Sequence, residues 1–393
     1  MHESTKLKID FGINIFRFVQ KNCCKVSKYL HFSGLNGIRA IAAMAVVFAH
    51  TTQQLNDFGL NSYIFGKLPD GYPTTTLLGG FSVSIFFSLS GFLITYLLLE
   101  EKKMNGINIK NFYFRRVLRI WPIYYLYIFL SGITLIIFSL PFEKNILFFY
   151  IFLVANIPFV FRFSIPLLEH FWSIGVEEQF YSFWPWVIKK NKSIFTITII
   201  IIIILISLKC FFRLYDIKMN HGQNNWPYLI IQVTRFQCML IGAVAAILFF
   251  EKNIIFLKLV NNYYLQFVSW IVFFTVAINK FHLISLLDNE LISLVTVFII
   301  IGQIQIKYRI INLNGSVLDF IGKISYGIYV LHPLILFYLS KIIVLSGDQN
   351  IFNYLVVYIL TFSTTIFIAY LSYHYFESKF LKLKERYSII VNH

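Results

Sequence analysis

The stretch LNGIRAIAAMAVVFAH, residues 35–50, is an apolar run interrupted by an arginine and a histidine eleven residues apart. At about 100° per residue, eleven residues make roughly three helical turns plus 20°, so Arg39 and His50 share one helix face. A rise of about 1.5 Å per residue separates them by roughly 16 Å along the axis. If this helix crosses a bilayer, His50 lies at a depth where an ionisable side chain is costly and is usually functional.

The whole chain has the composition of a membrane protein. Of its 393 residues, 58% are hydrophobic and only 13% are charged, and long apolar runs recur along the length. These features predict an all-α, polytopic helical membrane protein. The net charge of +16 would suggest nucleic-acid binding in a soluble chain. Here the basic residues fall between the apolar runs, so we interpret them as topology determinants and contacts with lipid headgroups, and we expect no nucleic-acid partner.

Ten apolar runs are long enough, or nearly so, to cross a bilayer. They are 36–53, 79–99, 119–140, 172–188, 193–212, 228–250, 264–280, 288–306, 323–342 and 350–376. An eleventh run, 145–161, is short and contains Asn156 and Pro158, so we interpret it as re-entrant. With ten spans, most Lys and Arg fall on one side, which predicts that both termini are cytoplasmic. We expect a basic cytoplasmic segment with an interfacial helix at 1–34, a transmembrane domain at 35–378 and a cytoplasmic tail at 379–393.

Two polar clusters adjoin predicted spans in the first half of the chain. The run FYFRRVLRIWP contains Arg115, Arg116 and Arg119 just before a span, a pattern that fits either topology alone or binding of phosphate groups. The run EHFWSIGVEEQFYSFWP, residues 169–185, places adjacent carboxylates and aromatic rings at the start of a span. Polar groups there must face protein or a water-filled cavity, which favours a functional site. Its candidate residues are His170, Trp172, Ser173, Glu177, Glu178, Gln179 and Tyr181.

Two further runs have a simple structural interpretation beside the functional one. The span at 79–98 is rich in Gly and Ser, which allows close helix packing or leaves room for a slender ligand. In KISYGIYVLHP, the residues Tyr326, Tyr329 and His332 are spaced by three and share a helix face. That stripe fits either ordinary packing or contact with a substrate.

Taken in order, these motifs resemble the acyltransferase-3 family, the integral-membrane enzymes that O-acylate bacterial surface glycans. The resemblance covers about residues 33–378, and it includes FFSLSGFLIT, RRVLRIWP, HFWSIGVEEQFY, ISYGIYVLHP and the closing YHYFE. Two positions depart from the family pattern, because Asn36 and Ser84 stand where carboxylates are usual. The chain is similar to the stand-alone form, without an appended esterase-like domain.

The resemblance implies an acyl-CoA donor, commonly acetyl-CoA, on the cytoplasmic side of a bacterial inner membrane. The implied acceptor is a hydroxyl of a cell-surface or exported glycan, such as lipopolysaccharide, or of a lipid-linked precursor. It makes His50, Arg39, Glu177 and Glu178 candidate catalytic residues, and Arg116 and Arg119, with neighbouring Arg115, candidates for binding the CoA phosphates. No metal is expected, and the oligomeric state is not readable from the sequence.

Acyl transfer from a thioester to a hydroxyl needs a base and a positive site for the developing oxyanion. His50 suits the first role, either as a general base or as a transiently acylated nucleophile, and the sequence does not choose between them. A transporter or flippase is the main alternative, because it would share the spans and the buried polar residues. An inert membrane scaffold is a third reading, against which the retained buried polar groups argue.

Overall fold

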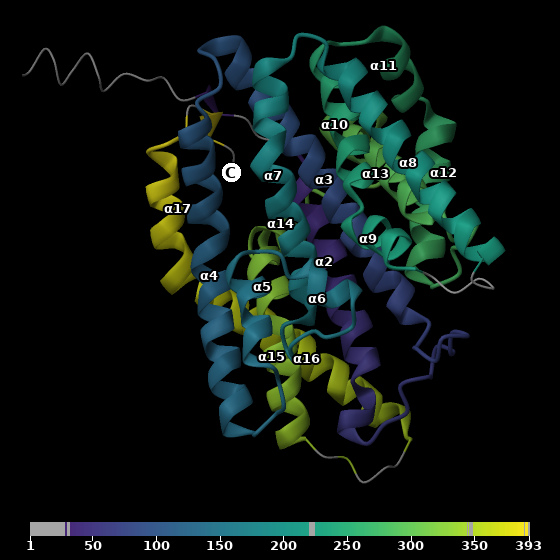
Figure 1. Ribbon diagram of the computed structural model, residues 1–393, viewed down its shortest axis with the longest axis vertical. Coiled ribbons are helices and arrows are strands. Elements are labelled where there is room, and N and C mark those ends of the chain that lie inside the picture. The colour runs from purple at the N-terminus through teal and green to yellow at the C-terminus, as the bar shows by residue number, and fades with distance from the viewer. Residues whose placement is uncertain are drawn as a thin grey trace, which may run out of the picture.

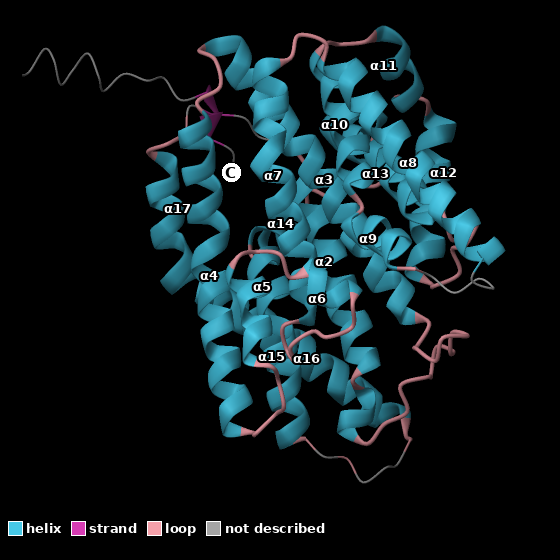
Figure 2. Ribbon diagram, in the orientation of Figure 1, coloured by secondary structure: helices cyan, strands magenta, loops and turns pink. Residues whose placement is uncertain are grey.

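The computed structural model describes residues 28–29, 32–219, 225–343, 345, 349–388 and 390–391. The interfacial helix predicted within residues 1–34 falls almost wholly outside these ranges. Within them, the regular secondary structure is helical apart from a two-residue parallel pairing of β1 (Lys28–Tyr29) with β2 (Ile390–Val391) and an isolated bridge between Lys67 and Pro73. The all-α prediction is therefore confirmed for the described residues (Figure 2).

The helices of the first half of the chain are α2 (Leu35–Gln53), α3 (Thr75–Met104), α4 (Ile109–Ile137), α5 (Leu147–Ile151), α6 (Asn156–Val160), α7 (Trp172–Lys190) and α8 (Ile194–Met219). The second half contains α9 (Trp226–Thr234), α10 (Phe236–Phe250), α11 (Ile254–Val260), α12 (Tyr263–Ala277), α13 (Asp288–Ile304), α14 (Ser316–Lys323), α15 (Ser325–Ile342), α16 (Ile351–Leu371) and α17 (Ser378–Glu385). A π-helix, η5 (Ser372–Glu377), joins the last two. Short 3-10 turns are η1 (Leu55–Phe58), η2 (Lys144–Ile146), η3 (Glu169–Phe171) and η4 (Ile306–Tyr308).

Six helices of the described chain are long and apolar enough to cross a membrane, or up to eight if two bent pairs each count as one span. The bent pairs are α11 with α12, at 55°, and α14 with α15, at 68°. The predicted count of ten is thus not confirmed. The other two predicted spans correspond to α7, which has two adjacent carboxylates, and α13, which has only 17 residues. The stretch 145–161 forms two five-residue helices, too short to cross, which agrees with its exclusion from the spans.

Helix α3 lies at the centre of the bundle, where it packs against α2, α10 and α13 (Figure 1). Glycines make this packing possible. A Cβ added at Gly91 would lie 1.9 Å from the carbonyl oxygen of Met239, and one added at Gly242 would lie 1.9 Å from that of Ser88. The small residues predicted to allow either close packing or ligand space therefore allow close packing on the α10 face of α3.

Several connections between the long helices lie at opposite ends of the bundle. In Figure 1 the α3–α4 and α10–α11 connections lie at the upper end, whereas the α2–α3 connection lies toward the lower end. Because α2 runs from the upper end downward, Arg39 lies nearer the upper end than His50. Which end faces the cytoplasm stays a prediction.

Candidate active site

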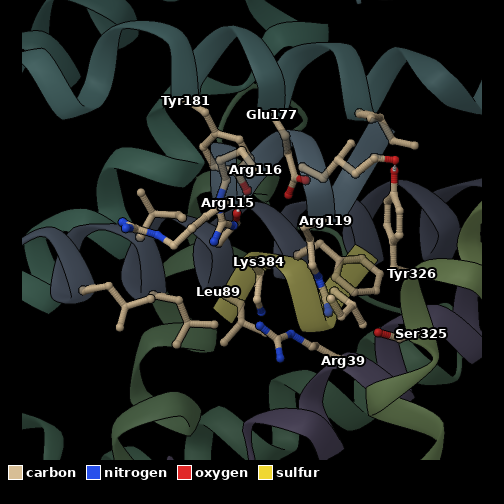
Figure 3. A pocket seen from close by; sticks show the side chains of 18 of the residues that line it. Arg39, Leu89, Arg115, Arg116, Arg119, Glu177, Tyr181, Ser325, Tyr326 and Lys384 are labelled. Atoms are coloured by element: carbon tan, nitrogen blue, oxygen red, sulfur yellow. Dashed lines mark hydrogen bonds between the residues drawn. The ribbon is translucent and has the colours of Figure 1, made fainter. Parts of the chain in front are cut away.

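A cavity of about 500 Å³ opens among α2, α3, α4, α7, α15 and α17. Its wall combines basic side chains with three carboxylates and a long apolar face (Figure 3). The basic residues are Arg39, Arg115, Arg116, Arg119, Lys323 and Lys384, and the acidic residues are Glu101, Glu177 and Glu385. Ser173, Tyr326 and Tyr329 also line it, and the apolar face includes Phe86, Phe87 and Leu93. We call this cavity the basic pocket.

Two of the six cations in the basic pocket are already neutralised. Arg115 forms an ion pair of 2.5 Å with Glu101 and donates to the carbonyl oxygen of Tyr387. Lys323 pairs with Asp319 at 2.7 Å. Within the described parts of the chain, the other four cations form no ion pair. They are Arg39, Arg116, Arg119 and Lys384.

The four unpaired cations gather in one place. The charges of Arg39, Arg116 and Arg119 all act on Lys384, and those of Arg116 and Arg119 act on Arg39. Figure 3 shows Arg39, Arg119 and Lys384 pointing toward one another across the pocket. Among the described residues, the Nε of Arg116 is buried without a hydrogen-bond partner, although its guanidinium lies over the rings of Phe112 and Tyr181. Like charges held this close repel one another unless an anion lies between them.

Asn36, which stands where the family usually has a carboxylate, orients Arg39. The Nη1 of Arg39 donates to Oδ1 of Asn36 at 3.0 Å, and Nδ2 of Asn36 donates to Oδ1 of Asp319 at 2.8 Å. A carboxylate is therefore present behind Asn36, because Asp319 of α14 accepts a hydrogen bond from the Asn36 amide. A neutral amide beside Arg39 leaves the charge of the guanidinium available to a ligand in the pocket.

The two adjacent glutamates of α7 have different surroundings. Glu177 lines the basic pocket, whereas Glu178 is not among its lining residues. One oxygen of Glu178 accepts from the indole nitrogen of Trp121 at 3.2 Å, and the other is buried without a partner among the described residues. Successive residues on a helix point about 100° apart, which explains why only one of them reaches the cavity. Tyr181, one turn after Glu177, lines the pocket and hydrogen-bonds to Ser90.

Gln179 lies away from the pocket and holds the 145–161 segment. Its Nε2 donates to Oδ1 of Asn156 at 2.7 Å and to the carbonyl oxygen of Leu153 at 3.4 Å. The predicted substrate-contacting Gln179 therefore fixes a neighbouring segment in this structure.

His50 and His332 contact each other directly, with Nδ1 of His50 and Nε2 of His332 separated by 2.8 Å. The Nδ1 of His332 lies 3.1 Å from the carbonyl oxygen of Ile328, which can only accept, so this nitrogen carries the proton. In the neutral pair, His332 then accepts at Nε2, and His50 donates from Nδ1. The Nε2 of His50 is left with a free lone pair, which is the form that a general base requires.

The histidine pair lies beyond the inner end of the basic pocket. Neither His50 nor His332 is among the lining residues, but Tyr329 is, and its ring centroid lies 6.0 Å from that of His332. The hydroxyl of Tyr329 is 2.6 Å from that of Ser173 and donates to the carbonyl oxygen of His170. The ring of His170 lies 5.5 Å from that of His332. Tyr329 and Ser173 thus connect the lining of the cavity to the histidines.

Two other predicted residues take part in the surrounding structure. Tyr326 lines the pocket and donates to the carbonyl oxygen of Ile120 in α4 at 3.1 Å. Trp172 is buried, packs against Phe87 and lies 5.4 Å beneath the guanidinium of Arg235.

Sequence reasoning missed several charged residues. Lys384 lies within the segment that we predicted to be a cytoplasmic tail. Arg235 is hidden in the apolar run 228–250, where it takes a left-handed backbone conformation (φ 45°) between α9 and α10 and donates to the carbonyl oxygen of Gly80. Lys209 and Glu290 likewise lie inside apolar runs and pair with each other at 2.6 Å. The signal that identified Arg39, a lone charge in an apolar run, applies equally to these residues.

Comparison with known proteins places the chain in a family. A family model described as an acyltransferase domain, that of the acyltransferase-3 family, matches residues 32–374. The chain therefore belongs to the acyltransferase-3 family.

Two relatives come from Staphylococcus aureus. A protein of strain COL named "Putative O-acetyltransferase SACOL0978" is 30% identical over 392 residues, covering 92% of this chain and 59% of the relative. The O-acetyltransferase OatA of strain NCTC 8325 is 28% identical over 386 residues, covering 90% of this chain and 57% of the relative. The chain thus spans less than two thirds of the length of these relatives. No solved structure matches the chain.

Proposed function

We propose that this protein is a membrane O-acetyltransferase that moves an acetyl group from acetyl-CoA to a hydroxyl of a cell-surface or exported glycan. The observation that carries this proposal is the set of four unpaired cations in the basic pocket. CoA has a diphosphate and a 3′-phosphate, so its charge complements Arg39, Arg116, Arg119 and Lys384. The names of the relatives support O-acetyl transfer as the reaction.

The proposed orientation of the donor follows from the shape of the pocket. The nucleotide lies among the cations, and the pantetheine arm runs along the apolar face toward Ser173 and Tyr329. Arg39 and His50 are separated by roughly 16 Å of helix rise, a distance that an extended pantetheine arm spans. In this orientation the thioester is presented close to the histidine pair. The basic pocket then opens to the cytoplasm, and the histidines face toward the outer leaflet of the bacterial inner membrane.

In the proposed reaction His50 acts as the general base. Its Nε2 takes the proton from the acceptor hydroxyl, whose oxygen attacks the thioester carbonyl carbon. The C–S bond then breaks, the CoA thiolate takes up the proton from His50, and the products are an acetyl ester and CoA. Direct transfer requires His50 to contact the acceptor hydroxyl and the departing thiolate, but not to attack the thioester carbonyl carbon itself, which suits a histidine close to the donor pocket but not lining it. His332 holds the tautomer of His50 that makes this possible.

The function is tested by the ester content of the surface glycan. Cells that express the protein are expected to carry acetyl esters on the glycan, and cells that express His50→Ala are expected to carry the same amount of glycan without them. His282→Ala is a matched control, because His282 is an exposed histidine paired with Asp288 away from the pocket. Loss of the glycan itself would indicate transport and would contradict the proposal, as would full acetylation with His50→Ala.

The direct route is tested by incubating the purified protein with labelled acetyl-CoA in the absence of an acceptor. We expect no label to remain on the denatured protein. A stable label on His50 would show an acyl-enzyme and would overturn the general-base step while leaving the proposed function intact.

A further inference from the structure

The C-terminal helix α17 forms one wall of the basic pocket. Leu381, Lys384 and Glu385 from this helix, and Ser388 just after it, line the cavity. The helix packs against α4, which carries Arg115, Arg116 and Arg119, as Figure 1 shows at the left of the molecule. This segment follows the last predicted span and had been assigned only to a tail.

A π-helix fixes the direction in which α17 faces. Glu377, at the end of η5, is buried, and its Oε1 accepts from the hydroxyl of Ser372 at 3.2 Å. The same carboxylate oxygen lies against Gly327 of α15, 3.1 Å from where a Cβ would be. Single π turns within α-helices are frequent at functional sites, because the extra residue changes which side chains face inward. Lys384 follows Glu377 by seven residues, about two turns, so both face the interior of the bundle.

Unlike Arg115 and Lys323, Lys384 has no carboxylate partner among the described residues. Arg115 is held by Glu101, and Lys323 is held by Asp319. In the part of the chain that the structure describes, Lys384 forms no ion pair, and the charges of Arg119 and Arg116 act on it more strongly than the opposite charge of Glu385. Its side chain is half-buried and points toward Arg39 and Arg119 (Figure 3). Placing an ammonium group among arginines is unfavourable unless a polyanion is bound there.

We infer that Lys384 binds a phosphate of the donor nucleotide, so that α17 selects a donor that carries the CoA nucleotide over one that ends at pantetheine. This inference rests on the proposed function, because it assigns a specificity-determining residue to the same pocket. The thioester end of the donor lies toward Tyr329, and the nucleotide end lies against α17. Lys384 therefore contributes to affinity only when the donor carries the phosphates.

The test compares the binding of acetyl-CoA and acetyl-pantetheine to the purified full-length protein in lipid nanodiscs. For Lys384→Gln we expect acetyl-CoA to bind about 10- to 100-fold more weakly, the loss typical of one charge-assisted hydrogen bond. Binding of acetyl-pantetheine should be unchanged. Lys384→Arg, which keeps the charge, should retain most of the affinity. Acetyl-3′-dephospho-CoA identifies the phosphate: if Lys384→Gln weakens its binding too, the diphosphate is the partner, and if not, the 3′-phosphate is.

Lys382→Gln is the matched control. Lys382 lies on the same helix, but it is exposed and about 160° away from Lys384 around the axis. Its substitution by Gln removes the same charge as Lys384→Gln. It should leave both affinities unchanged. Equal loss of both ligands with Lys384→Gln, or no loss of either, would overturn the inference. Failure of the unmodified protein to bind acetyl-CoA would instead contradict the proposed function, so the two failures are distinguishable.

Discussion

Two regions of this molecule hold charges within a largely apolar bundle: in one the charges are paired, and in the other like charges lie together without ion pairs among the described residues. In the first, Lys209 of α8 is fully buried and forms an ion pair of 2.6 Å with Glu290 of α13. Gln237 of α10 donates to the same carboxylate oxygen at 2.7 Å. In the second, the basic pocket, Arg116 and Arg119 lie together with no ion pair to either of them among the described residues.

The difference separates structural charges from ligand-binding ones. In the first region the two opposite charges neutralise each other, and together with Gln237 they link three helices. A group of like charges around a cavity stores electrostatic repulsion, which a bound anion relieves. The comparison therefore predicts that removing a charge lowers stability in the first region and lowers ligand affinity in the second.

The largest effect is expected when the buried pair is broken. Lys209→Met leaves Glu290 buried without its partner, which typically costs about 3–5 kcal/mol of folding free energy. The measurement is the thermal unfolding midpoint of the purified protein in detergent. The double variant Lys209→Met/Glu290→Gln should recover most of the loss, because no uncompensated charge remains. An unchanged midpoint for the single variant would remove the structural role assigned to this pair.

The opposite pattern is expected for the basic pocket. Arg119→Gln should weaken acetyl-CoA binding about 10- to 100-fold, because it removes a charge-assisted contact with phosphate. It should not lower the unfolding midpoint, since it also removes repulsion from Arg116. The control is Lys110→Gln, which removes an exposed charge from the same helix and should change neither quantity. If Arg119→Gln lowered the unfolding midpoint and left acetyl-CoA binding intact, the distinction between the two regions would be wrong.

A smaller effect is expected at the hydrogen bond between the two histidines. His332→Leu removes the acceptor for Nδ1 of His50 and frees the tautomer, so acetyl transfer should fall about 10-fold. His332→Gln, whose side-chain oxygen can accept in place of Nε2, should restore part of the rate. Acetyl-CoA affinity should stay the same in both variants. Equal rates for the Leu and Gln variants would argue against a role in orienting His50.

The smallest effect is expected at Asn36. Asn36→Ala removes one hydrogen bond that the Arg39 guanidinium donates and leaves Asp319 paired with Lys323. The KM for acetyl-CoA should rise by only about 2- to 10-fold, with little change in kcat. A large fall in kcat would mean that Asn36 takes part in the reaction itself.

Much of the pocket could be predicted from local sequence. Arg39, Arg116, Arg119 and Glu177 were candidates because each is a polar residue at or inside an apolar run, and the structure brings all of them to one cavity. Their roles stay predictions. The all-α bundle followed from composition in the same way, because apolar runs of this length have few alternatives to helix.

Features that depend on contacts between distant segments could not be predicted. His332 was assigned to the substrate, and its contact with His50 spans 282 positions of sequence. The break at Arg235 and the 68° bend between α14 and α15 depend on tertiary packing. No proline marks either position in the sequence. Lys384 was assigned to the tail because nothing in the local sequence shows that the helix after the π turn folds back against α4.

The most direct test of the central claim separates donor binding from transfer in one variant. His50→Ala should bind acetyl-CoA with unchanged affinity, because His50 does not line the basic pocket. Its rate of acetyl transfer to the glycan acceptor should fall by about 10²- to 10⁴-fold, the usual contribution of a general base. Transfer at the normal rate by a folded His50→Ala protein would contradict the account.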